Sequence, residues 1–536
     1  MDINQRIHIN QLGYRPKDKK VVICSEMDGT FYIVNEKNNE TVYEGILSAG
    51  ELDPSSKDKI YKGDFSSLEK HGSYYVLIPT SGKSYPFEIG DKVYTEVKKA
   101  LLKGLYFQRC GMELEEKHAG KWKHEACHLV DGIVYGHKDK TICATGGWHD
   151  AGDYGRYTVP GALSAADLMI TYRLFPEKIK DVINIPESGN AVPDILNECR
   201  YELEWLLKMQ DKDSGGVYHK LTTAKFVDLD MMPCGYVPKL IFSPISDSAT
   251  GDFAAVMAMA YDTYSTFDPD FSNQCLAAAL RAFEYLQNKK SLTEYKNPPG
   301  IMTGEYGDKV IIDELAWAAA QLYRVTGEDK YHQVFRNCYS SIGCELGWAD
   351  ISGMAKLTYL LTSPELVDKK IYTYIKNEWI STADRYLGIC SRDGYGIGLE
   401  PDEYLWGSNM TVANIGRHLI IANILEPNSD YVSGAQNHLH YLLGRNSLNQ
   451  CFITGFGSKP ILNPHHRPSV ADGITKPVPG LLSGGPNKGL HDDYAKNHLM
   501  GLPPAKCFAD HEDSYSTNEV AIYWNTPALF LAAYFD

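Results

Sequence analysis

The feature that most constrains the fold of this chain is a change in its hydrophobic pattern near residue 90. Before it, short runs rich in Val, Ile, Tyr and Phe alternate with turn-forming segments such as DGT, KNNE and TSGKS, a pattern typical of β-strands. After it, apolar residues recur at a spacing near 3.6, which predicts helices. We therefore expect two domains, an all-β domain over residues 1–90 and an all-α domain over residues 91–536.

The first region predicts a small sandwich of immunoglobulin type, because six or seven strands in about 90 residues fit that architecture. The runs that predict strands are RIHIN, KKVVIC, TFYIVNE, ETVYEGIL, GSYYVLIP and SYPFEIG.

The second region predicts about a dozen helices, many of them apolar on more than one side, as in TGDFAAVMAMAYDTYSTF and NEVAIYWNTPALFLAAYF. An inner ring of helices must be buried on most of its circumference, so this pattern favours a double-layered helical barrel. The alternative is an α-solenoid, but a solenoid has a fixed sequence period and we find none.

Composition argues against two kinds of partner. The net charge is -15, from 53 basic and 68 acidic residues, and no Lys/Arg block resembles a nucleic-acid binding surface. No run of about 18 uncharged apolar residues predicts a membrane span, and the opening MDINQRIHINQLGY lacks the apolar stretch of a signal peptide. By contrast, 36 Tyr and 8 Trp offer many flat faces with polar edges, which suit sugar rings as well as protein cores.

Two thiols and two imidazoles occur in one loop-rich region and form a candidate metal site. Most of the twelve cysteines lie singly in apolar helical patterns and are expected to be free core thiols. The exceptions are Cys110 and Cys127, which stand near histidines. Two thiolates and two imidazoles are ligands that a tetrahedral zinc prefers, although two buried thiols beside two surface histidines are an equal alternative. The set is Cys110, Cys127, His128 and His149, with His118, His124 and His137 as possible substitutes.

The stretch CATGGWHDAGDYGRY places Asp150 and Asp153 three positions apart, directly after His149. Two carboxylates can hold and partly deprotonate a single water, as the base side of a hydrolase requires. Taken alone, the segment favours another interpretation, in which one of them is the N-cap of the helix that begins near Val159.

Near the C-terminus, Glu519 stands at the start of an apolar, aromatic helix, three residues after Ser516. One interpretation is a capping box between these two residues. The other is a carboxylic acid desolvated by aromatic neighbours, so that its pKa rises and it can donate a proton to a leaving group.

Further polar and aromatic residues in loops are candidates for binding a neutral polar ligand. His465 and Arg467 follow a proline-rich loop in GFGSKPILNPHHRPS and can donate hydrogen bonds, although an incidental surface cluster is the alternative. Candidate sugar platforms are Tyr218, His219, Tyr404 and Trp406.

Together these motifs resemble glycoside hydrolase family 9, the inverting cellulases, in the subgroup with an N-terminal immunoglobulin-like domain. The resemblance covers nearly the whole chain in four segments that stand in the family's order. These are INQLGYRP, GGWHDAGDYGRY, TGFGSKPILNPHHR and FADHEDSYSTNEVAIYWN.

The resemblance implies an (alpha/alpha)6 barrel and a role for each motif residue. Asp153 is the general base, Asp150 helps to hold the water, and Glu519 is the general acid. His465 and Arg467 bind sugar near the cleavage point, Asp510 supports the site, and the four platform residues match outer subsites.

The resemblance also implies bound metal ions. The chain departs from the family pattern in two places. Zinc is held by the two thiols and two imidazoles, and calcium by Asp313 and Glu314, with Asp350 as a further ligand. Cys451 stands where Ser, Thr or Val is usual, and the stretch from Gly485 to Asp510 is poorer in acidic residues than in plant-type members, which leaves its loop contacts open.

We therefore expect an endo-β-1,4-glucanase that cleaves internal bonds of cellulose and soluble β-glucans with inversion, its two carboxyl groups about 6.5–9.5 Å apart. The alternatives are an exo-acting member, such as a cellobiohydrolase, β-glucosidase or exo-glucosaminidase, and a non-catalytic carbohydrate-binding protein. We expect a monomer with no nucleic-acid or membrane partner. Export is favoured because cellulose is extracellular, and a cytoplasmic role in oligosaccharide degradation is the alternative.

Overall fold

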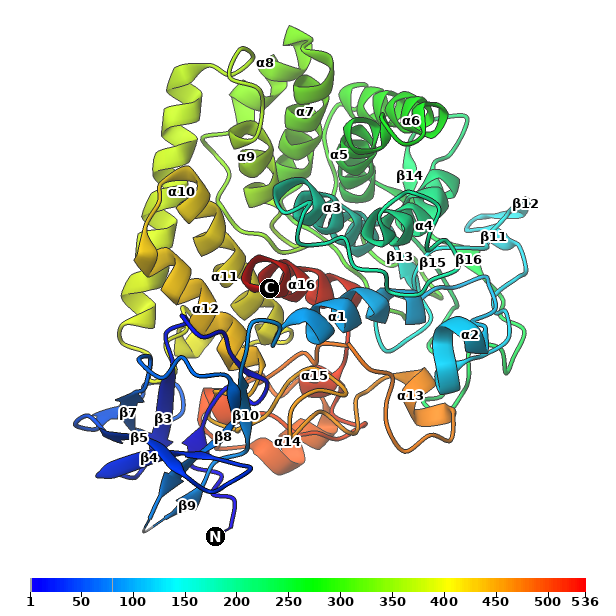
Figure 1. Ribbon diagram of the computed structural model, residues 1–536. Coiled ribbons are helices and arrows are strands. Elements are labelled where there is room, and N and C mark those ends of the chain that lie inside the picture. Colours follow the sequence, from blue (N-terminus) through cyan, green and yellow to red (C-terminus); the bar gives the residue numbers. More distant parts are fainter. Residues whose placement is uncertain (1, 80) are drawn as a thin grey trace. The chain divides into compact units, whose positions relative to one another are not determined.

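The computed structural model describes residues 2–79 and 81–536, which divide into two compact units (Figure 1). Unit 1 comprises Met1–Gly104 and Ala383–Asp536, and unit 2 comprises Leu105–Thr382. Unit 1 therefore joins the N-terminal β region to the last helices of the chain.

The β region of unit 1 consists of ten strands in two sheets, and all six runs that predicted strands contain one. One sheet has the order β1-β3-β7-β6, and the other has the order β2-β10-β8-β4-β5 with β9 paired to β8. The strands are β1 (Ile7–His8), β2 (Gly13–Tyr14), β3 (Val21–Ser25), β4 (Thr30–Asn35), β5 (Thr41–Ile46), β6 (Glu51–Leu52), β7 (Lys59–Asp64), β8 (Gly72–Ile78), β9 (Gly82–Lys83) and β10 (Phe87–Ile89).

Alternation of apolar residues explains how these strands form a core. In β8 every second residue from Tyr74 to Ile78 is buried. The sequence analysis did not identify β7, because KIYKGD carries two lysines and a glycine in six residues. The glycine, Gly63, is required by close packing, since a Cβ there would lie 2.4 Å from the ring of Phe31.

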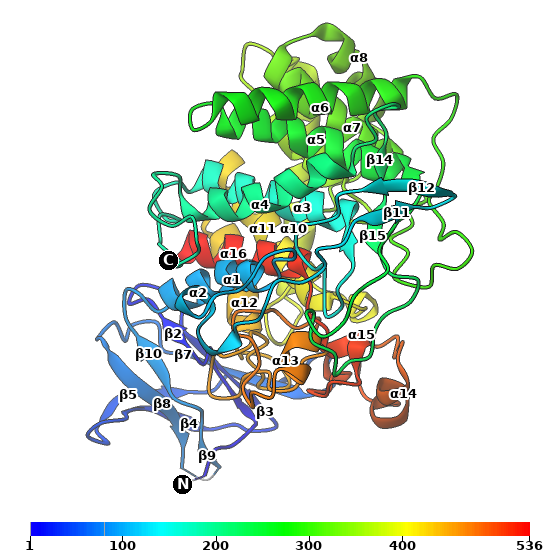
Figure 2. The ribbon, with the colours of Figure 1, turned by 90° about the vertical axis from the view of Figure 1, so that its right-hand side faces the viewer.

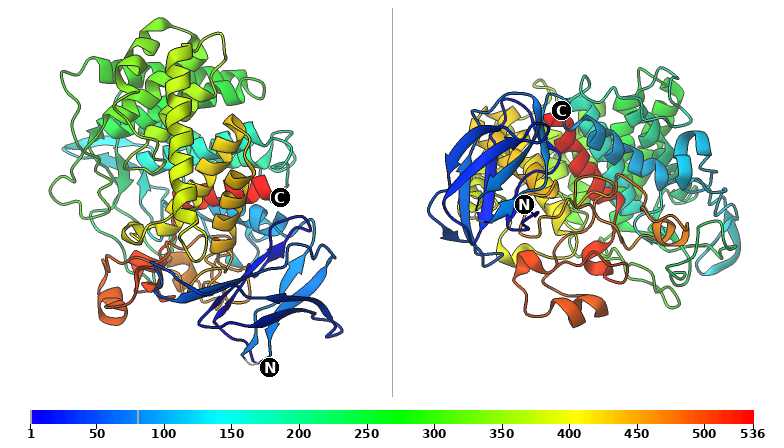
Figure 3. Two further views of the ribbon diagram at one scale, coloured as in Figure 1. Left: turned by 90° about the vertical axis from the view of Figure 1, so that its left-hand side faces the viewer. Right: turned by 60° about the horizontal axis from the view of Figure 1, so that its bottom comes forward.

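Buried polar contacts tie the sandwich, whose strands are drawn in blue in Figure 3, to the helices of unit 1. The amide of Asn10 donates to Nδ1 of His440 on α12 (Ser429–Leu442) over 2.9 Å. Gln11 donates to the carbonyl of Asn449 and accepts from the backbone of Ser458 and Lys459. The INQLGY segment is therefore part of the interior of unit 1.

Twelve α-helices of nine or more residues lie in the described part of the chain, as the helical pattern predicted. They are α1 (Thr95–Phe107), α3 (Thr158–Leu174), α4 (Asp194–Met209), α5 (Asp247–Tyr264), α6 (Pro269–Gln287), α7 (Ile312–Thr326), α8 (Asp329–Cys338), α9 (Ser352–Leu360), α10 (Lys369–Cys390), α11 (Ser408–Leu425), α12 and α16 (Ile522–Phe535).

In unit 2, helices that are buried on nearly all sides alternate along the chain with helices that are buried on one side only. Figure 2 shows one such pair, with α6 lying along α5. Every residue of α9 is buried, as are all residues of α3 up to Thr171 and of α5 up to Ala260. The buried helices pack in chain order, α3 on α5, α5 on α7 and α7 on α9, while α4, α6 and α8 cover them. This is the inner and outer arrangement that the sequence pattern favoured.

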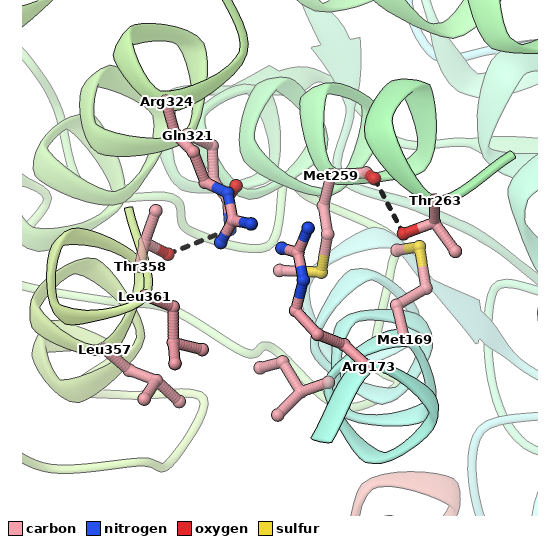
Figure 4. Close-up of a pocket in the computed structure, with 10 residues that line it drawn as sticks. Met169, Arg173, Met259, Thr263, Gln321, Arg324, Leu357, Thr358 and Leu361 are labelled. Carbon is pink, nitrogen blue, oxygen red and sulfur yellow. Dashed lines mark hydrogen bonds between the residues drawn. The ribbon is translucent and has the colours of Figure 1, made fainter. Parts of the chain in front are cut away.

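The C-terminal ends of the four buried helices meet at one small cavity (Figure 4). Its volume of about 10 Å³ admits at most one water molecule. Arg173 and Arg324 point toward each other there and share the carboxylate of Asp262. The N-terminal ends of these helices therefore share the opposite end of unit 2.

In unit 1, α11 packs on both α12 and α16. Helix α16 is buried from Ile522 to Ala533 and α11 from Val412 to Ala422. Among the described residues, no helix is both long and apolar enough to cross a membrane.

The buried contact between Asn10 and α12 gives a prediction about stability. We expect Asn10→Ala to lower the free energy of unfolding by about 3 kcal/mol, because it leaves several buried polar partners unsatisfied. Guanidinium denaturation measures this, and Asn38→Ala, at an exposed position, is the control with an expected change within about 0.5 kcal/mol. Equal stability of the two variants would contradict the prediction.

Candidate active site

Asp150 and Asp153 lie in unit 2, in an irregular segment that leads into β13 (Arg156–Tyr157) and then α3. They are 1% and 8% exposed. The N-cap of α3 is Tyr157, with no side-chain capping bond, so neither aspartate caps the helix and that interpretation is wrong. Oδ1 of Asp153 accepts a hydrogen bond from the backbone N–H of Gly155, which favours its ionised form.

The environment of Asp150 differs from that of Asp153. Oδ2 of Asp150 accepts a hydrogen bond of 2.6 Å from the hydroxyl of Tyr306, while Oδ1 has no hydrogen-bond partner. Burial, and then the charge of Asp153, raise the pKa of Asp150 well above its usual value, and the Tyr306 bond counteracts them. The pair therefore has one carboxyl group that is costly to ionise beside one that accepts a hydrogen bond from the backbone.

Tyr306 and Trp348 belong to this half of the site, although the sequence analysis did not identify them. The ring of Tyr306 contacts those of Tyr157 and Trp348, with centroids 4.9 and 4.8 Å apart. Its backbone φ is +49°, an uncommon conformation for a bulky residue. Both side chains come from loops without hydrophobic periodicity, so no local pattern predicted them.

The four residues of the candidate metal site meet in unit 2. The potential ligand atoms of Cys110, Cys127, His128 and His149 all lie within 4.8 Å of one another, and all four residues are buried. Among the residues that the structure describes, no other group of three or more Cys, His, Asp or Glu meets this criterion. The structure does not include His118, His124 or His137 in the group.

The surroundings of these residues suit a metal. Nδ1 of His128 is buried without a partner, while its Nε2 lies 3.0 Å from the hydroxyl of Tyr236. Burial lowers the pKa of His149 to about 4, so its ring is neutral and can donate a lone pair. Two thiols and two such imidazoles fit a tetrahedral ion with soft or borderline preferences.

Tyr154 connects this group to the aspartates. Its ring contacts those of His149 and His128, with centroids 4.9 and 5.6 Å apart. Its hydroxyl donates to the carbonyl of Met231. Because Tyr154 follows Asp153 directly, the metal-ligand group fixes the backbone on which that aspartate stands.

The C-terminal motif forms a second cluster, in unit 1. Glu519 follows the short helix α15 (Tyr515–Asn518) and is part of a β-bridge with His465. The predicted capping box with Ser516 is not formed, because Ser516 lies inside α15 and donates both its N–H and its hydroxyl to Asp492. Glu519 is partly exposed.

Asp510 holds the two motifs of unit 1 together. Its carboxylate accepts from the backbone N–H groups of Leu462 and Asn463 and from the amide of Asn518. His465 donates from Nδ1 to the carbonyl of Glu512 over 2.6 Å, which leaves Nε2 available. Arg467, 6% exposed, begins α13 (Arg467–Ala471) two residues later.

Of the four aromatic or imidazole platforms expected, the structure exposes one. Trp406 is 44% exposed and lies beside Tyr515, which is 37% exposed, with ring centroids 5.4 Å apart. Tyr404 and Tyr218 are buried at 1% and 3% exposure. His219 is fully buried, and its two ring nitrogens are used by Ser246 and the carbonyl of Glu305, so it has none left for a sugar.

Asp313 and Glu314 lie in the first turn of α7, within a group of buried carboxylates. The oxygens without a hydrogen-bond partner are both of Glu314, both of Asp252, and one each of Asp313 and Asp308. Burial raises the pKa of Asp313 to about 6 and that of Glu314 well above its usual value. Asp350 contacts the N–H of Ser352. Asp252 and Asp308 were not identified from the sequence.

Comparison with known proteins places the chain in a family. The sequence profile of Glycosyl hydrolase family 9 matches residues 94–532, and that of the Cellulase N-terminal ig-like domain matches residues 2–83. A cellodextrinase of Butyrivibrio fibrisolvens is 34% identical over 98% of both chains. Endoglucanase D of Acetivibrio thermocellus is 34% identical over 99% of this chain and 83% of its own.

Solved structures agree with this placement. A single mutant of a thermostable endoglucanase from Alicyclobacillus acidocaldarius has a TM-score of 0.94 and 37% identity over 99% of both chains. A Zn-binding triple mutant of the family 9 endoglucanase J30 has a TM-score of 0.92 and 30% identity over 97% of this chain and 99% of its own.

The fold and the two clusters thus define a glycosidase. The chain belongs to glycosyl hydrolase family 9, in the group with an N-terminal immunoglobulin-like domain, as the motifs predicted.

Asp492, which the sequence analysis did not identify, generates a prediction. It is 1% exposed, accepts from Ser516 and caps α14 (Asp493–Leu499) by accepting from the N–H of Ala495. We expect Asp492→Ala to cost about 3 kcal/mol of stability, because hydrogen bonds to charged groups are among the stronger ones. Urea unfolding measures this.

The neighbouring Asp493→Ala is the matched control, because that side chain is 96% exposed. We expect its effect to stay below about 1 kcal/mol. A cost at Asp493 equal to that at Asp492 would show that the buried contacts do not stabilise the turn before Glu519.

Proposed function

We propose that this protein is an endo-β-1,4-glucanase that hydrolyses internal bonds of cellulose-like and soluble β-glucans with inversion. The observation that carries the proposal is the pair of buried carboxyl groups, one of which accepts a hydrogen bond from the backbone of Gly155 and the other from the hydroxyl of Tyr306. Membership of family 9 and full-length similarity to an endoglucanase and a cellodextrinase support it.

Asp153 is the general base in this proposal. A base must be ionised when the water arrives, and the hydrogen bond from Gly155 favours that form. Asp150 orients the water through its unbonded Oδ1, while Tyr306 holds the other oxygen. Attack by a water, without a covalent intermediate, inverts the anomeric carbon.

Glu519 is the general acid, which gives its proton to the glycosidic oxygen as the bond breaks. Its backbone is fixed by His465 and by Gly484, whose N–H donates to the Glu519 carbonyl. His465 and Arg467 bind sugar hydroxyls, and Asp510 supports them by holding their loop.

Trp406 and Tyr515 form the sugar platform, because their exposed rings can cover the apolar faces of glucose units. Tyr404, Tyr218 and His219 act in packing instead, since the structure buries them.

Two alternatives remain to be tested against endo action. The first alternative is an exo-acting member that acts on short chains, and the similarity to a cellodextrinase is the observation that favours it. A non-catalytic carbohydrate-binding protein would have to keep Asp150 buried at a cost in free energy that no binding role requires. Products from a ladder of cello-oligosaccharides, with the anomer followed by NMR, separate these functions.

For the architecture, we propose an (alpha/alpha)6 barrel, preceded by a sandwich domain ending near residue 90. The support is that each unit contains helices buried on nearly all sides, as the inner helices of such a barrel would be. They are α3, α5, α7 and α9 in unit 2, and α11 and α16 in unit 1. A monomeric state and export from the cell remain predictions from the sequence.

For the metals, we propose a structural zinc at Cys110, Cys127, His128 and His149, supported by their convergence and by the unpartnered Nδ1 of His128. Zinc would neutralise the thiolates and pin the segment that carries Asp150 and Asp153. We propose calcium at Asp313, Glu314 and Asp350, supported by the unbonded carboxylate oxygens around α7.

The carboxylate assignment predicts the effect of two substitutions. We expect Asp153→Asn and Glu519→Gln each to lower kcat on a soluble β-glucan by at least about 100-fold, with unchanged melting temperature, because each removes a proton-transfer group. Reducing-sugar release measures the rate. Glu365→Gln, at an exposed position, should keep full activity, and near-full activity of Asp153→Asn or Glu519→Gln would overturn the assignment.

The zinc assignment predicts a loss of stability before a loss of rate. Chelation should lower the free energy of unfolding by about 4 kcal/mol or more, because zinc at about 1,000 times its Kd stabilises by that amount. The rate per folded molecule should change less. Denaturation with and without chelator measures the first quantity, and zinc content by mass spectrometry gives the stoichiometry.

Cys127→Ser should remove the zinc, whereas Cys143→Ser should not, because Cys143 is exposed and outside the ligand group. Full zinc content in Cys127→Ser would show that the ion binds elsewhere.

A further inference from the structure

Lys220 is a buried lysine in unit 2 that the proposed mechanism does not use. It begins β15 (Lys220–Thr222), is 0% exposed, and is the cross-strand partner of Tyr157. Strand β13, which contains Tyr157, begins three residues after Asp153. The lysine therefore lies on the strand next to the segment that carries the base.

The ammonium of Lys220 is held by one loop, residues 297–304. Nζ lies 2.7 Å from Oδ1 of Asn297, 2.6 Å from the carbonyl of Gly304, and 3.2 and 3.4 Å from the hydroxyl and carbonyl oxygens of Thr303. These four acceptors carry no net charge. The positive charge is thus surrounded by dipoles in a buried place, where an uncompensated charge is costly.

The same loop leads directly to Tyr306, whose hydroxyl donates to Asp150. Glu305 reinforces the loop by accepting from the backbone N–H of Asn297. Lys220 therefore connects β15 to the segment that brings Tyr306 to the aspartate pair.

Two aromatic rings and two carboxylates face the ammonium. It lies 5.4 Å from the ring centroid of Tyr157 and 6.0 Å from that of Tyr295. Burial lowers the pKa of Lys220 to about 8, and the charges of Asp153 and then Glu305 counteract that effect. The charges that favour the protonated form of Lys220 are therefore those of the proposed base and of Glu305.

We propose that Lys220 is a positioning residue of the active site, whose ammonium ties the loop of residues 297–304 to β15 and provides the counter-charge that keeps Asp153 ionised. The inference rests on the proposed role of Asp153 as the base. Its consequence is that both the placement of Tyr306 and the proton affinity of the base depend on one buried positive charge.

The pH dependence of kcat/KM for Lys220→Met and Lys220→Arg tests the proposal. In Lys220→Met, we expect kcat to fall at least about 10-fold with little change in KM, and the acid limb to move up by about one pH unit, because the base loses its counter-charge. Lys225→Met, at an exposed position nearby, should match the wild type.

Lys220→Arg supplies the opposite test. A guanidinium stays charged at all accessible pH, so the acid limb should remain where it is in the wild type. The alkaline limb reports the general acid, Glu519, and should not move in either variant. An acid limb that moves in Lys220→Met but not in Lys220→Arg would not follow from a purely structural role, which melting temperature and metal content monitor.

A Lys220→Met variant with wild-type kcat and pH profile would overturn the proposal. So would a Lys220→Arg variant whose acid limb moves as far as that of Lys220→Met. Asp153→Asn, measured in the same series, distinguishes this failure from failure of the proposed function. An active Asp153→Asn refutes the base assignment, whereas an inactive one beside an unchanged Lys220→Met refutes the role of Lys220 alone.

Discussion

The arrangement of unit 2 depends on the burial of helices that are apolar on every side. Such helices cannot face water, so α3, α5, α7 and α9 pack against one another and are covered by α4, α6 and α8. Because the four run in the same direction, the segments that precede them share one end. Asp150 and Asp153 precede α3, and Tyr306 precedes α7, so a packing requirement assembles this half of the site.

Within the two clusters of the site, charged side chains are held by many fixed dipoles. Asp510 and Asp492 in unit 1 are bonded largely to backbone N–H groups and hydroxyls. In unit 2, Lys220 is surrounded by neutral oxygens. Groups held in this way need little reorganisation when charge develops in a reaction, which is how electrostatic preorganisation lowers barriers.

The sequence predicted those features that have a local pattern. Alternation located six strands, and the spacing of apolar residues located most long helices, because burial of one face or of a whole helix imposes a period. Strand β7 was missed because its lysines and glycine interrupt that pattern. The helix-cap interpretations of Asp153 and Ser516 were wrong because these side chains make other contacts. Asp153 bonds locally to the N–H of Gly155, and Ser516 makes a tertiary contact with Asp492.

The candidate site was predicted through motif resemblance rather than through physical pattern. Asp153, Glu519 and the metal-ligand residues stand in recognisable segments, whereas Tyr306, Trp348 and Lys220 act through contacts between loops far apart in the chain. The burial of Tyr404 and His219 could likewise not be predicted from the sequence, because aromatic and polar residues of loops occur both in the interior and on the surface of proteins.

The contact of Gln11 with Ser458 and Lys459 bears on how this protein can be modified. Those two residues begin the loop that continues to His465, so the sandwich supplies an internal brace for a loop with a proposed role in catalysis. The N-terminal domain therefore cannot be replaced without an effect on this loop. A chimera with another sandwich would have to keep Gln11 and the residues that position it, so the two domains have to be exchanged together even though their folds are unrelated.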